Sequence, residues 1–392
     1  MTEIKIHQNI TPNKINDLYR KYILHENLGN VSLIIPGEFN KYRFGLLADL
    51  LKFVITLNNN SLISTLKIDI DKESIDSFYD QEYAYPVISL LWNTSKFLDK
   101  SNNDIKEILR FKQNDYFKKM NSLQSLKGRK YILSNTDHLS KNNGLIKFLE
   151  NSDGFNDDED YIIDNIKRIL NEHVLIFNKQ NSAELKSIIE EIGGIIFELT
   201  KNTYEWGKTD ANMITIPTSI RGVYFRFHNN SIDKIIEEFD NTPIKDFFHH
   251  NYINEYCINE LNRVYYLEIL VYDSGIGYIE RFIDRGTLSD IDIIKKCLIK
   301  NQTSSTSNLK SKKGLGLDRI LNIMDKKGFV RISTDKYCVY RDLIKDNYKL
   351  TPIEELENLK LEDWNKNNFT SNNQIKSQGS FISILYPFKS NI

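Results

Sequence analysis

Apolar residues recur along the first part of the chain at spacings that predict both strands and helices. Residues 31–36 form a short apolar run, residues 44–54 carry apolar side chains at helical spacing, and residues 62–70 alternate between apolar and polar side chains. Helical spacing returns in residues 87–98 and 105–126. The pattern therefore predicts a mixed α/β fold for this part of the chain, beginning with strand, helix and strand.

A polar segment at residues 151–160 marks the expected boundary between two domains. Its sequence, NSDGFNDDED, concentrates turn formers and acids between two segments with periodic apolar residues. A short strand-like run at 131–133 precedes it. A chain of 392 residues also exceeds what one core usually serves. We therefore expect a separate mixed α/β domain over residues 1–155 and a second domain over residues 156–392. No chemical motif appears in the first, so a regulatory or partner-binding role is expected for it.

The second half alternates between helical and strand-like patterns. Helical spacing covers residues 161–177 and 183–206, and alternation follows over residues 213–227. A polar, helix-permissive stretch continues to about residue 259, before an apolar run at 265–272 that ends in a glycine-rich turn. This order predicts further α/β structure with strands that deliver polar residues into turns.

Composition describes a folded protein without an electrostatic signal. Lys and Arg total 52 against 53 for Asp and Glu, so binding to nucleic acid is not indicated. Cys257, Cys297 and Cys338 are widely spaced, which argues against a disulfide framework or a structural zinc site. The N-terminus lacks a signal-peptide core and no apolar run could span a bilayer, so we expect a cytoplasmic protein without a membrane segment.

The first group with chemical potential is Glu198, Asn202 and Glu205, which lie at i, i+4 and i+7 in the second predicted helix. This spacing places the three polar groups on one helix face. A carboxylate beside a carboxamide could polarise a water and hold a hard cation, as phosphate chemistry requires. A solvated helix face is the alternative for this segment taken alone.

The second group is the run LEILVYDSGIG, in which a strand delivers Asp273 into a turn containing Gly275, Ile276 and Gly277. A buried carboxylate at a strand end can accept a hydrogen bond from an exocyclic amine, and glycines let the backbone approach a flat ring. A dinucleotide-binding turn would need a third glycine where Glu280 stands. An ordinary β-turn stays open as an alternative.

The third group is KKGLGLDRIL, where Gly314, Leu315 and Gly316 open an apolar-periodic helix. Backbone N–H groups at such a helix start attract phosphate. The spacing of a Walker loop is absent. The upstream residues 301–310 are small and polar, which is the composition of a lid. The lysines just before Gly314 could neutralise phosphate charge or belong to a solvated loop. They are Lys310, Lys312 and Lys313.

In this order, the three groups resemble the nucleotide boxes of the GHKL superfamily, which includes gyrase B, the histidine kinases and heat-shock chaperones. The helix resembles the N-box, Asp273 to Gly277 the D-x-G-x-G box, and Gly314 to Leu317 the second glycine box. A later Gly379–Ser380, followed by an apolar run ending in Pro387, resembles the closing G-T and final strand. The resemblance covers about residues 180–390 and implies a two-layer α/β sandwich that binds ATP with Mg²⁺.

The resemblance also implies roles for single residues. Glu198 would activate the attacking water, Asn202 would ligate Mg²⁺, and Asp273 would bind the adenine amine. The residues expected to contact the nucleotide are Asn202, Glu205, Asp273, Gly275, Ile276, Gly277, Lys310, Lys312, Lys313, Gly314, Leu315, Gly316, Leu317 and Ser380. The sequence departs from the family pattern where Lys312 replaces the leading glycine of the second box, and where residues 335–378 separate a strand at 329–334 from Gly379.

These implications lead to one main functional hypothesis and two alternatives. We expect a slow Mg²⁺-dependent ATPase in which lid closure regulates the N-terminal domain or a protein partner of unknown identity. The oligomeric state stays open, although nucleotide-linked homodimerisation is frequent in the superfamily. A histidine-kinase activity would need an acceptor upstream of the N-box, where His173 is the nearby candidate, in a context that favours a structural role. A binding module that holds ATP without significant turnover is the second alternative.

Overall fold

The computed structural model of the protein describes residues 1–24, 28–124, 126–176, 178, 183–282, 286–299, 316–366, 368–369 and 376–390. The N-terminal elements alternate between strands and helices. They are β1 (Thr2–Lys5), α1 (Pro12–Leu18), η1 (Tyr19–Ile23), β2 (Asn30–Pro36), α2 (Leu46–Asn60), β3 (Leu62–Asp69), η2 (Lys72–Ser74), α3 (Ile75–Phe78), α4 (Ala84–Leu91), β4 (Lys96–Leu98), α5 (Lys106–Asn121), β5 (Lys130–Thr136) and α6 (Lys141–Gly144).

The remaining elements are long antiparallel strands with helices between them. They are β6 (Glu150–Asn151), β7 (Gly154–Phe155), α7 (Glu159–Ile169), η3 (Leu170–Val174), α9 (Ile189–Trp206), β8 (Ile220–Ser231), α10 (Ile232–Glu238), α11 (Pro243–Phe248), α12 (Asn251–Tyr256), β9 (Arg263–Asp273), α13 (Tyr278–Arg281), α14 (Asp290–Cys297), α15 (Gly316–Ile323), β10 (Phe329–Thr334), β11 (Tyr337–Asp342), η5 (Ile353–Asn358), β12 (Glu362–Asp363) and β13 (Ser380–Pro387).

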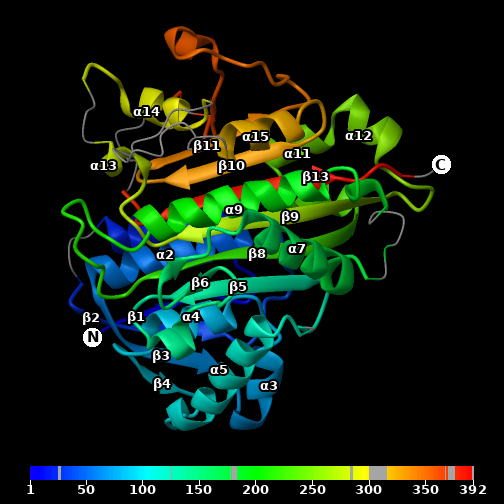
Figure 1. The fold of residues 1–392 in the computed structure, drawn as a ribbon. Helices are drawn as coiled ribbons and strands as arrows, with labels where there is room; N and C mark the ends of the chain where they lie inside the picture. The colour runs from blue at the N-terminus through cyan, green and yellow to red at the C-terminus, as the bar shows by residue number, and fades with distance from the viewer. Residues whose placement is uncertain are drawn as a thin grey trace.

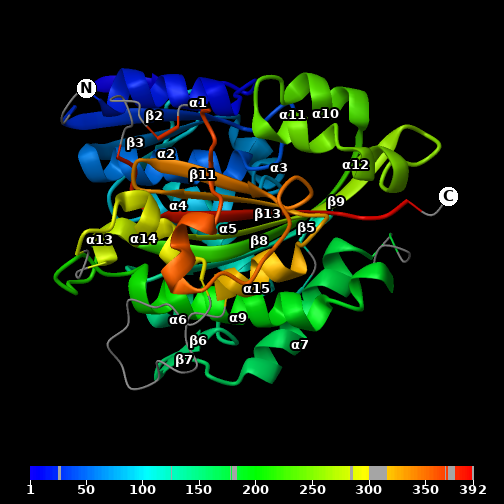
Figure 2. The ribbon, with the colours of Figure 1, turned by 90° about the horizontal axis from the view of Figure 1, so that it is seen from above.

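Two main sheets organise these elements, as the mixed α/β prediction requires. The first is a parallel sheet in the order β1-β2-β3-β4, and the second is an antiparallel sheet in the order β12-β11-β10-β13-β9-β8-β5. In the seven-stranded sheet, α9 and α15 lie on one face and α2 lies on the opposite face (Figures 1 and 2). The polar groups at the ends of β9 and β13 are therefore held between a helical layer and the N-terminal part of the chain.

The expected boundary at residue 155 does not coincide with the division between the sheets. Strand β5 lies before this boundary, yet its residues Lys130–Thr136 pair with Arg226–Ile220 of β8 at the edge of the seven-stranded sheet. One contiguous cluster of buried apolar side chains also includes residues from both sheets, such as Leu33 and Ile269. The N-terminal part is thus integrated into the core of the second sheet.

Several element predictions are confirmed and three need correction. The apolar runs at 265–272 and 329–334 are β9 and β10. The long helix within the predicted range 183–206 begins only at Ile189, after a turn at 186–188. The predicted helix at 87–98 ends at Leu91, because β4 pairs residues 96–98 with β3. The predicted strand at 213–227 begins only at Ile220, because the preceding residues form a turn closed by a bridge between Thr209 and Thr215.

Local signals explain where two helices begin. The Asp158 side chain accepts a hydrogen bond from Tyr161 N at the start of α7, and Ser289 and Asp292 form a capping box at the start of α14. None of the helices in the described part of the chain combines the length and apolar character that crossing a membrane demands.

Candidate functional site

Asp273 is a buried carboxylate at a strand end of the seven-stranded sheet. It is the last residue of β9, where its neighbours across the sheet are Arg221 of β8 and Ser380 of β13. The side chain is nearly inaccessible, and its Oδ1 accepts a hydrogen bond of 2.8 Å from Gly275 N. Burial raises the pKa of Asp273 to about 6, while the backbone N–H groups of Gly275 and Ser380 oppose that rise.

Glycines surround Asp273 so closely that larger residues would not fit. A Cβ at Gly207 would lie 2.6 Å from the Asp273 Cβ, and one at Gly275 would lie 2.9 Å from its Oδ1. Gly379 has a φ of +93°, and a Cβ there would lie 2.3 Å from the Asp273 carbonyl oxygen. Gly277 has a φ of +86°. These glycines therefore let the backbone pack directly against the Asp273 carboxylate and carbonyl.

Helix α9 brings the predicted N-box residues to the same region. Its apolar positions are buried, whereas Glu198, Asn202 and Glu205 are partly exposed on the polar face. Its C-terminus reaches Asp273 through Gly207. At a rise of about 1.5 Å per residue, Asn202 and Glu198 lie about 7 Å and about 13 Å back along the helix from Gly207. An extended ligand could thus contact Asp273 at one end and Glu198 at the other.

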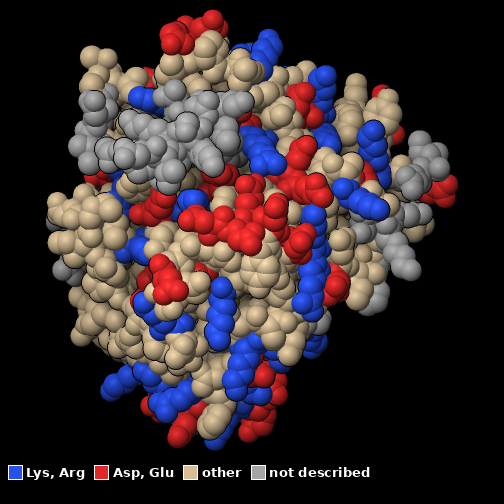
Figure 3. Space-filling model, viewed as in Figure 1, with Lys and Arg blue, Asp and Glu red and all other residues tan. Residues whose placement is uncertain are grey.

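Acidic side chains gather over α9 (Figure 3). Burial raises the pKa of Glu198, and the nearby carboxylates of Glu159 and Glu205 raise it further, against the opposing effect of Lys201 and Arg319. A carboxylate whose pKa is shifted towards neutrality is a better proton acceptor at physiological pH. The environment of Glu198 therefore fits a water-activating base.

The second glycine box falls partly outside the described residues. Lys310, Lys312, Lys313, Gly314 and Leu315 belong to that undescribed segment. The residues that follow form α15, as the apolar period predicted. Gly316 begins this helix and Leu317 is buried.

Helix α15 packs against α9, the helix that carries Glu198, Asn202 and Glu205. A Cβ added at Gly194 of α9 would lie 2.4 Å from the Arg319 guanidinium. Helix α15, which follows the predicted second glycine box, therefore lies directly beside α9. Of the remaining predicted contacts, Ile276 is partly exposed and Ser380 is buried beside Asp273.

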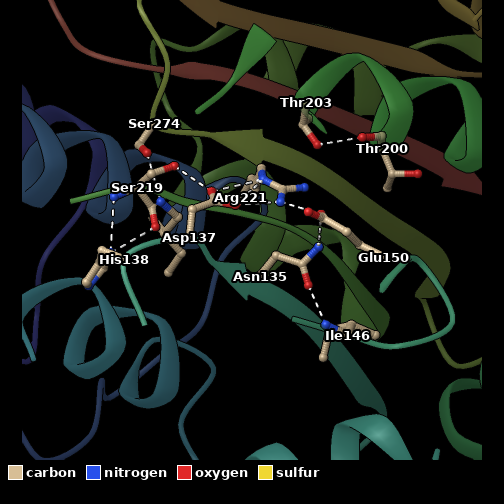
Figure 4. A network of polar contacts seen from close by, with 11 residues as sticks. Asn135, Asp137, His138, Ile146, Glu150, Thr200, Thr203, Ser219, Arg221 and Ser274 are labelled. Atoms are coloured by element: carbon tan, nitrogen blue, oxygen red, sulfur yellow. Dashed lines mark hydrogen bonds and ion pairs between the residues drawn. The ribbon is translucent and has the colours of Figure 1, made fainter. Parts of the chain in front are cut away.

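A buried polar network joins β8, the strand beside Asp273, to Asp137 and Glu150. The guanidinium of Arg221 donates to Asp137 Oδ1 at 2.6 Å and also to Glu150 (Figure 4). Burial alone would lower the pKa of Arg221, but these two carboxylates hold it above its usual value. The Ser274 hydroxyl accepts a hydrogen bond from Ile220 N. The network fixes β8 beside Asp273.

Sequence reasoning did not identify Arg221 or Gly207. Asp137 and Glu150 are separated from Arg221 by 84 and 71 positions, so no local spacing announces this network. Gly207 directly follows the end of α9, and a glycine just beyond a predicted helix is a signal that could have been noted.

The loop before β13 connects this region to α2. Gln378 N donates to Thr56 Oγ1 of α2 at 3.0 Å, and the Gln378 side chain donates to the Ser274 carbonyl at 3.0 Å. The adjacent Gly379 N donates to the Gly275 carbonyl at 2.8 Å. The turn after Asp273 is therefore joined to the N-terminal part of the chain through one short loop.

His173, the acceptor considered for a kinase, is packed into the structure. Its Nε2 lies 2.9 Å from the Leu123 carbonyl oxygen, and its ring stacks on Tyr131. These contacts favour the structural role that its sequence context suggested.

Within the described ranges, no group of three or more His, Cys, Asp or Glu side chains is arranged to hold a metal ion. A magnesium ion bound by Asn202 would take its remaining ligands from phosphate oxygens and water, as Mg²⁺ commonly does with nucleotides.

A scan against protein-family models and searches of curated proteins and of solved structures found no match for this chain.

Proposed function

We propose that the protein binds ATP together with Mg²⁺ and hydrolyses it slowly, and that nucleotide binding regulates the N-terminal part of the chain or a protein partner. The observation that carries this proposal is Asp273, a buried carboxylate surrounded by glycines at the C-terminal end of a helix bearing Glu198 and Asn202. The packing of α9 and α15 on one face of an antiparallel sheet supports a helix-on-sheet arrangement of the GHKL type, to which α2 on the opposite face adds a further layer.

Each residue of the proposed site has its own role in binding or hydrolysing ATP. Asp273 accepts a hydrogen bond from the exocyclic amine of adenine, with the base lying against the bare backbone at Gly275 and Gly277. Asn202 supplies a carboxamide oxygen for Mg²⁺ beside the phosphates. Glu198 removes a proton from the attacking water, and its raised pKa suits that role.

Calorimetric titration with ATP and Mg²⁺, paired with a phosphate-release assay, tests this proposal. Asp273→Asn should weaken ATP binding by about 10-fold to 100-fold, since a hydrogen bond to a charged acceptor contributes about 1.5–3 kcal/mol. Glu198→Ala should abolish phosphate release while binding persists. Glu191→Ala is a matched control, because Glu191 is exposed on the same helix outside the proposed site.

The outcomes separate the parts of the proposal. Binding without phosphate release in the wild type would contradict hydrolysis and leave a binding module. Absence of ATP binding, or binding that is unaffected by Asp273→Asn, would contradict the nucleotide site itself.

A further inference from the structure

A second pocket, of about 300 Å³, lies between α4, α5 and the segment that follows β5. None of the residues assigned above to the nucleotide site lines it. Its lining residues are Tyr85, Trp92, Asn93, Arg110, Gln113, Asn114, His138, Leu139, Ser140 and Asn143. Its volume is at the lower end of the range for pockets that hold small organic ligands.

The lining of this pocket favours an anion. No aspartate or glutamate occurs among its described lining residues, whereas Arg110 is exposed at it and makes no ion pair within the described part of the chain. The guanidinium group binds phosphate or carboxylate oxygens in a bidentate geometry. An anionic group would therefore be attracted to Arg110 without repulsion from the pocket wall.

The lining also contains groups that recognise heterocyclic rings. Aromatic side chains are contributed by Tyr85 and Trp92, and carboxamides by Asn93, Gln113, Asn114 and Asn143. A carboxamide presents a donor and an acceptor side by side, which matches the edge of a nucleobase. Aromatic and carboxamide groups together suit a flat, polar ring better than an aliphatic chain.

Gln113 carries an unmet hydrogen-bonding requirement at this pocket. Its side chain is buried and its Nε2 donates to Ser89 Oγ at 2.7 Å, which fixes the orientation of the carboxamide. Its Oε1 is buried and has no hydrogen-bond partner among the described residues. A buried acceptor without a donor is unfavourable and is rare in folded proteins. A ligand N–H entering from the pocket would satisfy it once a small shift of the Gln113 side chain exposes Oε1.

We propose that this pocket binds a mononucleotide-sized anion, with an N–H of its base donated to Gln113 Oε1 and its phosphate facing Arg110. The asparagine carboxamides then meet the remaining polar groups of the base. This proposal does not depend on the ATP site proposed above, because no residue is shared between the two.

The test is calorimetric titration of the full chain with AMP, GMP, CMP and UMP. It is carried out in an Asp273→Asn background, so that the proposed ATP site does not contribute. At least one probe is expected to bind with a Kd below about 1 mM and a stoichiometry of one. Arg110→Gln should weaken that binding by about 10-fold, and Gln113→Met should weaken it similarly.

Lys118→Gln provides the control, because it removes one positive charge from an exposed position on α5 outside the pocket. Arg110 is itself exposed, so Arg110→Gln should leave the thermal midpoint unchanged and keep the test independent of folding. The proposal is overturned if none of the four probes binds below about 1 mM, or if Arg110→Gln and Lys118→Gln bind the probe equally well. Binding of a probe in a protein that fails to bind ATP would still support this pocket while rejecting the first site.

Discussion

A buried ion pair between α2 and β10 gives the sharpest prediction about stability. The Arg331 guanidinium donates to both Asp49 oxygens, with distances of 3.1 Å and 2.5 Å, and both side chains are almost fully buried. Replacing Asp49 by leucine leaves the Arg331 charge buried without its counter-ion. Removing one partner of such a pair costs about 3–5 kcal/mol, because the remaining charge is desolvated and unpaired.

The expected change in the melting temperature follows from the size of the chain. An unfolding entropy of about 2.1 cal/mol/K per residue gives about 0.8 kcal/mol/K for 392 residues. Asp49→Leu should therefore lower Tm by about 4–6 °C in differential scanning calorimetry. The double variant Asp49→Leu/Arg331→Met should recover most of this loss, because it removes both charges and keeps apolar volume at the site.

Asp17→Leu is the control, since Asp17 is largely exposed and pairs only at the surface with Arg20. The reasoning is refuted if Asp49→Leu lowers Tm no more than Asp17→Leu does. It is equally refuted if the double variant is no more stable than Asp49→Leu alone.

Three further predictions concern pH and glycine. ATP affinity should fall by up to about 10-fold per pH unit below the Asp273 pKa of about 6, where the carboxylate becomes protonated, and titrations between pH 5 and 7 should show no such slope for Asp273→Asn. Burial raises the pKa of Glu268 to about 8, so the folded chain retains a proton that the unfolded chain releases above its ordinary pKa. Stability should then decrease as pH rises from about 6.5 to 8, by at most about 1.4 kcal/mol per unit, because below that range the lowered pKa of His228, the buried partner of Glu268, acts in the opposite direction. Urea titrations of Glu268→Gln that kept the full slope would contradict this. Gly379→Ala should reduce stability more than Gly128→Ala. Both glycines have φ near +93°, but only at Gly379 would the added Cβ meet backbone, 2.3 Å from the Asp273 carbonyl oxygen. Equal urea midpoints for the two variants would contradict this prediction.

The sequence was most informative where a long apolar run ends in a glycine turn. Strand β9, with Asp273 at its end, follows directly from such a run, and strand β10 follows from a shorter apolar run that begins after Gly328. Helix α9 was equally predictable, because its apolar positions keep a helical period up to Trp206. These elements carry Glu198, Asn202 and Asp273, so the local skeleton of the candidate site could be predicted from patterns within single segments.

Features created by distant pairing could not be predicted in this way. Residues 130–136 have the pattern of a strand, but nothing in that pattern selects β8 as its partner instead of β4. The network of Arg221 with Asp137 and Glu150 depends on that pairing, so it was missed as well. The acidic segment at 151–160 has the composition of a linker, yet its hairpin, β6 and β7, packs Phe155 against Phe197 of α9.

The place of β5 determines how the protein can be divided for experiments. A fragment of residues 156–392 would lack β5 and leave residues 220–226 of β8 as an unpaired sheet edge. It would also remove both carboxylates that neutralise the buried Arg221. Exposed edges of this kind recruit strands from other molecules. Expression of the second half alone should therefore yield aggregated material, and an inactive fragment would say nothing about the activity of the whole chain.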